Sequence, residues 1–452
     1  MTRGFRTRSL HAGTEPDPAT GARATPIHQT TSFVFEDADE TAERYALRAD
    51  GHIYSRLSNP TVSALERRIT DLEGGSDAVA TGSGMAAIDA IATVLARAGD
   101  NVVAASEMYG GTSAYFTTIL NRRGVEARLV ETLDYEAYEE AIDEDTAFVH
   151  VETIANPSLV TPDFERLADI AHEHAVPLVV DNTFATPYLC RPFEHGADIV
   201  WESTTKWITG NGTTVGGIVV DGGQFPWDHP EADYDELAGK SPAYPIDFVE
   251  QFGDAAFANV ARQRGVRPTG GQQSPFDAWQ TIQGLNTLPL RMDRHCENAR
   301  QVAEFLREDE RVDWVTYPGF EDHPTHDNAA EYLDGYGGMV TFGVDAGYEA
   351  AKTLCEAVEL TSFLANVGDA KSLIIHPAST THAQMSETEQ VAAGVFPDML
   401  RLSVGIEDPE DVIADLDAGL DAGERAATDS ETSADSETSA DVTGPGNDAA
   451  EE

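Results

Sequence analysis

Cysteine and long apolar runs are both scarce in this chain of 452 residues. The three cysteines, Cys190, Cys296 and Cys355, are far apart and form no Cys-x-x-Cys pair. They therefore provide neither a disulfide framework nor the spacing of a metal site, and they fit a reducing cytoplasm. Because no run of about 18 uninterrupted apolar residues is present, we expect no membrane-spanning helix. The first residues also lack the apolar segment of a secretory signal, so we expect a cytoplasmic protein.

Positive charge is also scarce: 29 Lys and Arg residues stand against 79 Asp and Glu residues, giving a net charge of −50. Residues 424–452 carry nine acids and one arginine, so the rest of the chain still has a net charge of −42. Such a chain is a poor partner for nucleic acid and for anionic membranes. Acidity spread along a chain with only four lysines is typical of salt-loving cytoplasms, where cations screen the repulsion. We therefore predict a halophilic origin, against the alternative of a very soluble acidic protein.

The apolar residues that are present are numerous enough, at 41%, for a globular protein with two sizeable cores. From about residue 61 to residue 220, short β-branched runs alternate with segments of helical spacing. The runs are NVVAAS, TAFVHVE, VPLVVD and ADIVWE. This alternation predicts an α/β fold with a mostly parallel sheet that helices cover on both sides.

The composition changes along the chain and predicts four parts. Residues 1–60 contain clusters of Pro, Gly and Thr, which indicate an extended arm. Residues 61–261 hold the alternating strands and helices of the large domain, and residues 262–423 predict a smaller α+β domain. Residues 424–452 are acidic, repeat the segment DSETSA and lack apolar residues, so we expect a disordered tail without a catalytic role.

One of the four lysines has an unusual setting. Lys206 lies between Thr205 and Trp207, directly after the apolar run ADIVWE and before the Gly-rich segment ITGNGTTVGG. Because the chain has so few lysines, an ordinary solvent-exposed position is a poor explanation for the presence of Lys206. A desolvated lysine amine forms Schiff bases with carbonyl compounds, which indicates covalent chemistry.

Two further segments carry weaker signals. TGSGMAAIDAIATVL is a Gly-containing turn before a helix whose backbone N–H groups suit a phosphate, although most such turns are structural. VPLVVDNTF ends a buried strand at Asp181, which either pairs with a cationic ring nitrogen or caps the next loop. Together with Lys206 and its neighbouring hydroxyls, these are the parts that pyridoxal 5′-phosphate (PLP) needs: an attachment point, a phosphate cup and a pyridinium partner.

Eight motifs of the chain resemble those of the Cys/Met-metabolism family of fold-type I PLP-dependent enzymes. They are YSRLSNPT, SGMAAI, MYGGT, ETIANP, VDNTFATP, STTKW, GDAKSLIIHPASTTH and LRLSVGIE. The resemblance runs from about Thr7 to Glu407. It implies the fold of a fold-type I PLP-dependent transferase and a homo-oligomer, in which dimers share active sites and assemble into a tetramer. Trp207, Gly111 and the aromatic insertion after Val220 are most similar to the sulfhydrylase branch of the family.

The resemblance also implies a role for each matching residue. Lys206 would hold PLP as a Schiff base and shuttle protons, Asp181 would keep the ring nitrogen protonated, and Tyr109 would stack on the ring and assist proton transfer. The other implied contacts are Asn156 with the phenolic oxygen, Gly84, Met85, Ser203 and Thr205 with the phosphate, Tyr54 and Arg56 with the phosphate of a neighbouring subunit, and Arg401, Asn366 and Tyr54 with the substrate. Asn211 stands where many relatives have His, and nothing in the sequence explains that change.

The implied activity is γ-replacement in methionine biosynthesis, in which O-acetyl-L-homoserine and sulfide give L-homocysteine and acetate. Cystathionine γ-synthase, cystathionine γ-lyase and methionine γ-lyase use the same residues and are alternatives within the family. A non-catalytic binding protein on the same fold is the alternative from another class, although every expected catalytic position carries a competent residue. A metal enzyme is disfavoured, because His172 and His174 are two residues apart on a predicted helix and cannot share a face.

Overall fold

A seven-stranded, mostly parallel sheet forms the centre of the computed structural model, which describes residues 3–239, 246–384, 386–392 and 394–440. The strand order is β1-β7-β6-β5-β4-β2-β3, and β7 runs antiparallel to both of its neighbours. The strands are β1 (Asp77–Thr81), β2 (Asn101–Ala105), β3 (Glu126–Val130), β4 (Thr146–Glu152), β5 (Leu178–Asp181), β6 (Ile199–Glu202) and β7 (Gly217–Asp221). The four apolar runs named above are β2, β4, β5 and β6, which confirms the predicted α/β fold.

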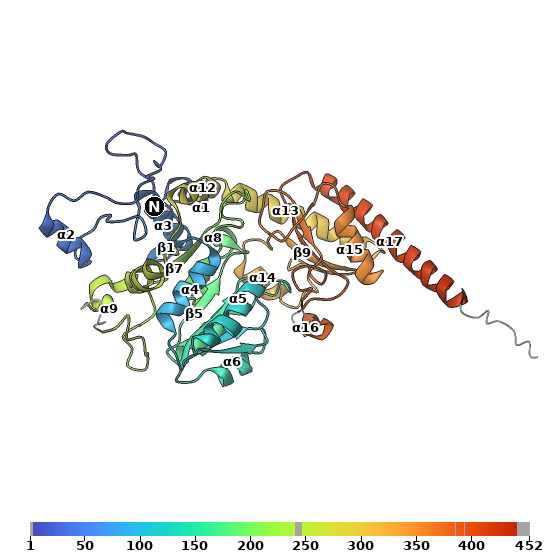
Figure 1. The fold of residues 1–452 in the computed structure, drawn as a ribbon, viewed down its shortest axis with the longest axis horizontal. Coiled ribbons are helices and arrows are strands. Elements are labelled where there is room, and N and C mark those ends of the chain that lie inside the picture. The colour runs from blue at the N-terminus through green and yellow to red at the C-terminus, as the bar shows by residue number, and fades with distance from the viewer. Residues whose placement is uncertain (1–2, 240–245, 385, 393, 441–452) are drawn as a thin grey trace, which may run out of the picture.

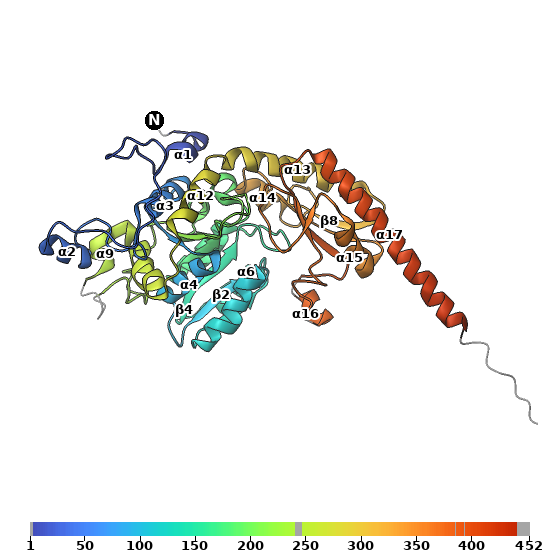
Figure 2. The ribbon, with the colours of Figure 1, turned by 45° about the horizontal axis from the view of Figure 1, so that its top comes forward.

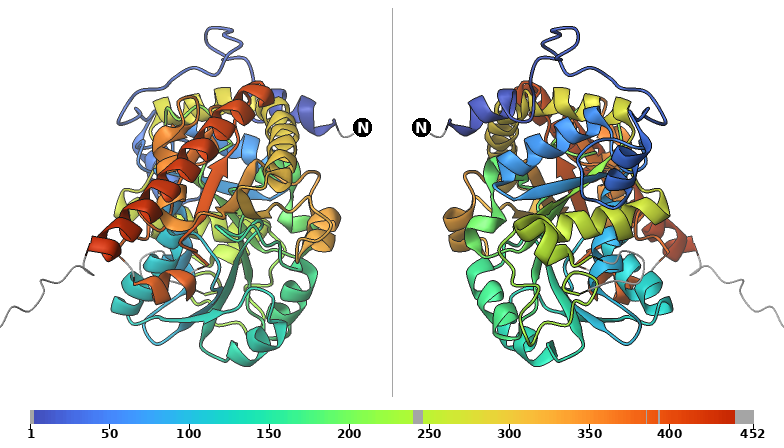
Figure 3. Two further views of the ribbon diagram at one scale, coloured as in Figure 1. Left: turned by 90° about the vertical axis from the view of Figure 1, so that its right-hand side faces the viewer. Right: turned by 90° about the vertical axis from the view of Figure 1, so that its left-hand side faces the viewer.

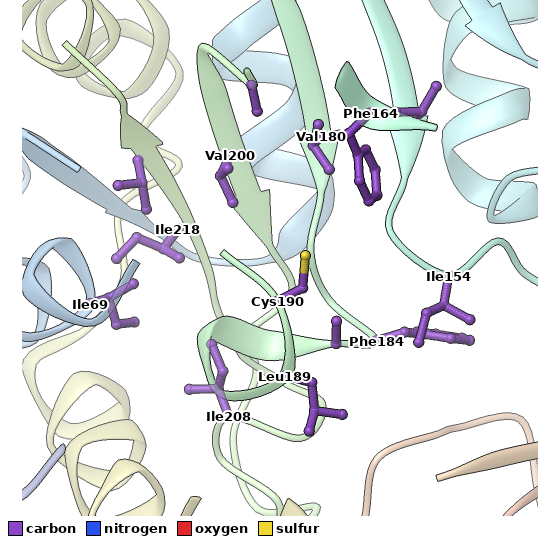
Figure 4. Packing of buried hydrophobic residues seen from close by; sticks show 14 of the residues in the cluster. Ile69, Ile154, Phe164, Val180, Phe184, Leu189, Cys190, Val200, Ile208 and Ile218 are labelled. Carbon is purple, nitrogen blue, oxygen red and sulfur yellow. The ribbon is translucent and has the colours of Figure 1, made fainter. Parts of the chain in front are cut away.

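Helices cover both faces of this sheet (Figure 3), because successive residues of each buried strand point to opposite sides. The helices α3 (Pro60–Glu73), α7 (Phe164–Glu173) and α12 (Pro275–Leu285) pack on one face, and α4 (Gly84–Leu95) and α10 (Ala256–Val260) pack on the other. Figure 4 shows the first of these cores, where Val180, Val200 and Ile218 of the strands share one cluster with Ile69 and Phe164. These two cores hold the strand ends, and hence the loops after them, in fixed positions.

A second, five-stranded sheet follows in the chain and has the order β10-β11-β12-β9-β8. Its strands are β8 (Val312–Thr316), β9 (Met339–Val344), β10 (Ser362–Phe363), β11 (Leu373–Ile375) and β12 (Met399–Ser403). They are antiparallel except for the pair β10 and β11. The long helix α13 (Leu288–Glu308) runs from the first sheet to the second, and α15 (Gly347–Ala357) packs on the second sheet (Figure 1).

The boundary between the two units differs from the predicted one at residue 262. Val266 belongs to one core of the first sheet, and Ile282 and Leu285 belong to the other. The second unit therefore begins within α13, and residues 262–285 belong to the large unit. No change in composition marks this boundary, since helices of both units carry similar apolar spacing.

The first sixty residues contain little regular structure. Helix α1 (Phe5–His11) packs against α3 and α13, and α2 (Ala38–Tyr45) lies at the far edge of the molecule (Figures 1 and 2). Between α1 and α2 the chain is irregular, and the side chain of Val34 is 97% exposed.

The C-terminal helix α17 (Pro409–Ala440) extends well beyond the second sheet (Figure 2). Its first turns are anchored because Val412, Leu416 and Leu420 recur at helical spacing and enter the core of the second sheet. The helix includes residues 424–440, for which the composition predicts disorder, while residues 441–452 lie outside the described residues. Ala and Glu have high helix propensity even in a helix without an apolar face. A low content of large apolar residues therefore does not by itself exclude a helix.

The remaining α-helices are short and connect these larger elements. They are α5 (Gly110–Ala114), α6 (Tyr135–Ala141), α8 (Thr186–Leu189), α9 (Phe248–Phe252), α11 (Arg267–Thr269), α14 (His326–Tyr332) and α16 (Glu387–Ala392). Among the residues that the structure describes, none of the helices combines the length and hydropathy that a bilayer span requires.

Candidate active site

The predicted site residues gather where neighbouring parallel strands end. Strands β2, β4, β5 and β6 run in the same direction, so their carboxyl ends meet at one edge of the first sheet. Tyr109, Asn156, Asp181 and Lys206 each lie at the end of one of these strands or in the loop after it. This edge is where open α/β sheets bind their ligands.

Lys206 occupies the turn after β6 and is mostly buried. Its Nζ donates a hydrogen bond to Oδ1 of Asn366 at 2.5 Å. Burial and, secondarily, the positive charge of Arg401 lower the pKa of Lys206 to about 8. Because a lysine ordinarily titrates near pH 10, this environment makes the neutral amine much more available near neutral pH. The structure thus places Asn366 against Lys206, in addition to its predicted contact with substrate.

A buried arginine that the sequence analysis did not single out holds the lysine turn in place. Nη1 of Arg291, on α13, donates to the carbonyl oxygen of Trp207 at 2.5 Å, and its Nη2 donates to that of Ile208 at 3.0 Å. Gly210 has φ of +67°, and a Cβ there would lie 1.9 Å from Nη1 of Arg291. Glycine is therefore required both for the backbone conformation and for the close approach of the guanidinium. Arg291 fixes the carbonyls directly after Lys206.

Asp181 ends β5 and is 6% exposed. Its Oδ1 accepts hydrogen bonds from the N–H and the hydroxyl of Thr183, at 2.9 and 2.5 Å. Its Oδ2 receives no hydrogen bond from the residues that the structure describes. Burial without a cationic neighbour raises the pKa of Asp181 to about 7. A buried carboxylate with one open oxygen is what a protonated ring nitrogen needs as a partner.

The start of α4 and the turn after β6 form a small cradle. Gly84 begins the 12-residue helix α4, and a Cβ at Gly84 would lie 2.8 Å from the Cβ of Ser203. The N–H groups of Gly84 and Met85 make no hydrogen bond to described residues, so they are available to an anion. The hydroxyl of Thr205, which the resemblance places at the phosphate, donates to the oxygen of Gly216 at 3.1 Å and accepts from the N–H of Gly216 at 3.0 Å.

Arg401 reaches the site from β12 of the second sheet. One of its guanidinium nitrogens, Nη1, donates to Oδ1 of Asn156 at 3.1 Å. Burial lowers the pKa of Arg401 to about 10, and no carboxylate among the described residues forms an ion pair with it. Since a buried guanidinium normally has an anionic partner, the unused donors of Arg401 fit the carboxylate of an amino acid.

Tyr109 precedes α5 and is 49% exposed. A Cβ at Gly111 would lie 2.4 Å from Cε1 of the Tyr109 ring, so glycine allows the ring to lie over the helix start. The backbone N–H of Tyr109 donates to Oε1 of Glu152 at 2.6 Å. Glu152, the last residue of β4, belongs to the motif ETIANP, but nothing in the sequence indicates its role beyond its place at the end of a strand.

Tyr54 and Arg56 lie apart from these residues on the N-terminal arm. The guanidinium of Arg56 lies 5.7 Å from the ring centre of Tyr54, and its Nη1 donates to the oxygen of Arg267 at 2.5 Å. No hydrogen bond of the described residues joins either side chain to Lys206 or Asp181. Within one chain, therefore, the two arm residues are not part of the cluster.

The clustered residues fit PLP on three independent features. Asp181 leaves an oxygen open for a protonated ring nitrogen, Gly84 and Ser203 leave a cradle that a side chain would fill, and Lys206 is a buried amine with a lowered pKa. Of the pair His172 and His174, which was weighed as a metal site, His172 has an acidic partner instead, because its Nε2 lies 2.8 Å from Oδ2 of Asp198. Among the described residues, no group of three metal-ligating side chains occurs.

Comparisons with known proteins relate the chain to one enzyme family. The chain matches the family model described as Cys/Met metabolism PLP-dependent enzyme over residues 6–421. It is 47% identical over 420 residues to the homocysteine synthase of Schizosaccharomyces pombe, covering 92% of this chain and 98% of that protein. It is also 47% identical over 420 residues to O-acetyl-L-homoserine sulfhydrylase 1 of Thermus thermophilus, covering 92% of this chain and 99% of that one.

A solved structure extends the similarity to the fold. It is a crystal structure from Campylobacter jejuni named for an O-acetylhomoserine (thiol)-lyase, with N′-pyridoxyl-lysine-5′-monophosphate at position 205 of that chain. It superposes on this chain with a TM-score of 0.90 at 35% identity, covering 93% of this chain and all of the other. The similarity in fold therefore includes both sheets.

Proposed function

Because the chain belongs to the Cys/Met metabolism family of PLP-dependent enzymes, we propose that it catalyses γ-replacement on O-acetyl-L-homoserine. Sulfide adds at the γ-carbon, acetate leaves from the same carbon, and L-homocysteine is formed. The observation that carries this assignment is the 47% identity, over 92% of the chain, to proteins named homocysteine synthase and O-acetyl-L-homoserine sulfhydrylase. The geometry supports it, since the site offers a base, a cofactor partner and a carboxylate partner together.

PLP is the cofactor of this family, and when bound it supplies an electron sink for negative charge that develops on the substrate carbon. We assign its covalent attachment to Nζ of Lys206 and its ring nitrogen to the open Oδ2 of Asp181. Gly84 and Ser203 form the cradle for its phosphate, and Tyr109 stacks on its ring. These assignments use the donors and the open oxygen that the protein leaves without internal partners.

Lys206 also acts as the base toward the substrate. Its neutral Nζ takes the proton from the α-carbon and returns a proton at the end of the reaction. The lowered pKa of about 8 leaves a useful fraction of the free amine unprotonated near neutral pH. Asn366 accepts a hydrogen bond from Nζ and so limits the directions in which the amine can point.

Arg401 binds and orients the substrate. Its guanidinium is held by Asn156 on one side, and the remaining donors match the two oxygens of an α-carboxylate. A fixed carboxylate holds the α-carbon of the substrate in a defined position relative to Lys206. Lys206 lies close enough to Arg401 for the positive charge of Arg401 to lower its pKa. The substrate is therefore held by the second sheet while the base comes from the first.

The N-terminal arm contributes to the site of a second subunit. Tyr54 is 42% exposed and Val34 is 97% exposed, which suits a segment that is covered by another copy of the chain. In such a dimer, Tyr54 and Arg56 would reach the phosphate of the partner's cofactor, and pairs of dimers would form the tetramer. A homo-oligomer with shared sites follows from this proposal.

A hybrid experiment tests the shared site. Lys206→Ala and Arg56→Ala are prepared separately, each expected to be nearly inactive, and are then dissociated and reassociated together. If Arg56 acts across the interface, one site of each mixed dimer lacks both groups and the other has both, so activity near half the wild-type level per dimer returns. Verified mixed dimers that stay inactive would show that Arg56 acts within its own chain.

Substrate competition tests the reaction itself. Purified protein in molar salt is offered sulfide or cysteine as acceptor and O-acetyl- or O-succinyl-L-homoserine as donor. We expect homocysteine from sulfide and the acetyl ester to form faster than cystathionine from any pair. If cysteine and O-succinyl-L-homoserine are the better pair, the chain is a cystathionine γ-synthase instead.

A further inference from the structure

Glu152 is a buried carboxyl group whose two oxygens both serve the site. It is the last residue of β4 and is paired in register with Asp181 of β5. Glu152 is 5% exposed. Oε1 accepts the backbone N–H of Tyr109 at 2.6 Å, and Oε2 accepts the backbone N–H of Asn156 at 3.0 Å. One side chain thus fixes two separate loops.

These two loops carry groups of different function. Tyr109 follows β2 and presents its ring at the start of α5. Asn156 follows β4, and its Oδ1 accepts a hydrogen bond from Arg401 at 3.1 Å. A continuous chain of hydrogen bonds therefore runs from Tyr109 through Glu152 and Asn156 to Arg401 of the second sheet. A shift of Glu152 would move both the stacking ring and the support of the carboxylate-binding guanidinium.

Burying this acid has a free-energy cost that an apolar residue would avoid. Burial, together with the neighbouring carboxyl of Asp181, raises the pKa of Glu152 well above its ordinary value. Two N–H donors offset part of the desolvation, and an apolar side chain at this position would leave the N–H groups of Tyr109 and Asn156 without this acceptor. The geometry indicates what the acid provides, namely two acceptors of fixed spacing between two loops of the site.

We propose that Glu152 is a positioning residue, which sets the ring of Tyr109 and the amide of Asn156 relative to Lys206. The inference rests on the proposed function for its kinetic readout and on the hydrogen bonds for its structural readout. Glu152→Gln is the sharpest variant, because the amide has the same shape but turns one acceptor into a donor that faces a backbone N–H. At least one of the two loops must then move.

Glu66→Gln is the matched control. Glu66 lies on α3, is 4% exposed, and its Oε1 accepts the backbone N–H of Ala80 at 3.0 Å and a hydrogen bond from Arg262 at 2.8 Å. It is a buried carboxyl in the same unit that also accepts a backbone N–H, but it contacts none of the site residues. Its variant reports what the loss of a buried acid does to stability alone.

The experiment compares both variants with wild type as full-length, PLP-loaded protein. We expect Glu152→Gln to speed amide hydrogen exchange at Tyr109 or Asn156 and to lower kcat/KM for O-acetyl-L-homoserine about 100-fold, as a small misplacement of reacting groups does. Most of the loss should lie in kcat, and the melting temperature should fall no further than in Glu66→Gln. The control should keep wild-type exchange at both amides and kcat/KM within a few-fold.

Three results would overturn the proposal. The first is Glu152→Gln with wild-type exchange and kcat/KM, and the second is Glu66→Gln with the same losses as Glu152→Gln. If Glu152→Gln does not fold, Glu152→Asp replaces it; this shorter acid should lose one of the two bonds and retain more activity than the amide. Wild-type exchange and activity in Glu152→Asp would be the third. An inactive wild type would instead reject the proposed function and leave the exchange result standing.

Discussion

The two sheets of the molecule build the site in different ways. The first sheet contributes residues at or just after the carboxyl ends of parallel strands, such as Asp181 at the end of β5 and Lys206 after β6. The second, mostly antiparallel sheet contributes Arg401 from the middle of β12 and Asn366 from the loop between β10 and β11. The position of residues at the carboxyl ends of parallel strands follows from the topology of the sheet. An arginine in the middle of a strand, in contrast, could point to either face of its sheet.

The charges divide in the same way. The edge of the first sheet presents the buried acids Glu152 and Asp181, and the second sheet presents the buried cation Arg401. A ligand that joins a cationic ring nitrogen to a carboxylate has matching charges at its two ends. Under the proposed function, the first sheet holds the cofactor and the second holds the substrate, so variants of the two sheets should fail differently.

The largest effect is expected on the first sheet, in Asp181→Asn. An amide of the same shape cannot balance a protonated ring nitrogen, and an unpaired buried charge costs about 3 kcal/mol or more. We therefore expect kcat to fall at least about 100-fold with a smaller change in KM. Steady-state kinetics with saturating PLP would measure both, and wild-type kcat would remove Asp181 from the cofactor contact.

Arg401→Ala on the second sheet should affect binding more than chemistry. A charge-assisted hydrogen bond contributes about 1.5–3 kcal/mol, so KM for the donor substrate should rise roughly 10- to 100-fold. Arg401→Lys should recover part of this loss, because it keeps the charge but not the paired donors. If kcat fell and KM stayed constant in both variants, the division between the two sheets would be wrong.

Asn366 lies where the two sheets meet, so Asn366→Ala should have a smaller, mixed effect. The variant removes the acceptor for Nζ of Lys206 and so withdraws a hydrogen bond that favours the charged ammonium. The pKa of Lys206 should therefore fall further, so the acidic limb of the pH profile of kcat should shift to lower pH. The rate at the optimal pH should fall by a few-fold. A shift to higher pH would contradict the contact with Lys206.

The smallest kinetic effect is expected in Glu73→Gln, at the last residue of α3, which packs on the first sheet. Glu73 packs against Glu202, both are buried, and burial raises the pKa of Glu73 to about 8. The folded protein then holds a proton that the unfolded chain releases near pH 4.5, so this group lowers stability as pH rises from about 4.5 to about 8. Glu73→Gln should remove that share, at most about 5 kcal/mol, with little change in kcat.

Urea unfolding at pH 5 and pH 8 would measure this share as a difference between wild type and variant. We expect the loss of stability between the two pH values to be smaller in Glu73→Gln than in wild type. Equal losses in both proteins would show that Glu73 is ionised in the folded state.

Much of the first sheet could be predicted from the sequence. Buried strands such as TAFVHVE are mostly apolar runs, and parallel topology brings their ends together, so the sequence alone singles out Asp181 and Lys206. Gly84, which the sequence also places near a phosphate, lies close to Ser203, since a Cβ at Gly84 would lie 2.8 Å from the Cβ of Ser203. Their roles toward PLP are predictions that the variants above test.

What the sequence did not reveal depends on contacts between distant segments. Arg291 lies 84 residues from Trp207, whose carbonyl it binds, and its sequence neighbourhood is an ordinary helix. The hydroxyl of Thr205 likewise contacts the backbone of Gly216, 11 residues later in the chain. Glu152 has no local signal that separates it from any acid at the end of a strand. Such pairings are set by the packing of the whole chain.

The central claim is that Lys206, a buried amine between the two sheets, holds PLP, and peptide mapping tests it most directly. The purified protein is reduced with borohydride, digested, and searched for the pyridoxyl group by mass spectrometry. The account predicts the label on Lys206 alone, and predicts that Lys206→Ala abolishes both the label and the yellow colour. A label on Lys240, Lys352 or Lys371, with Lys206 unmodified, would contradict it.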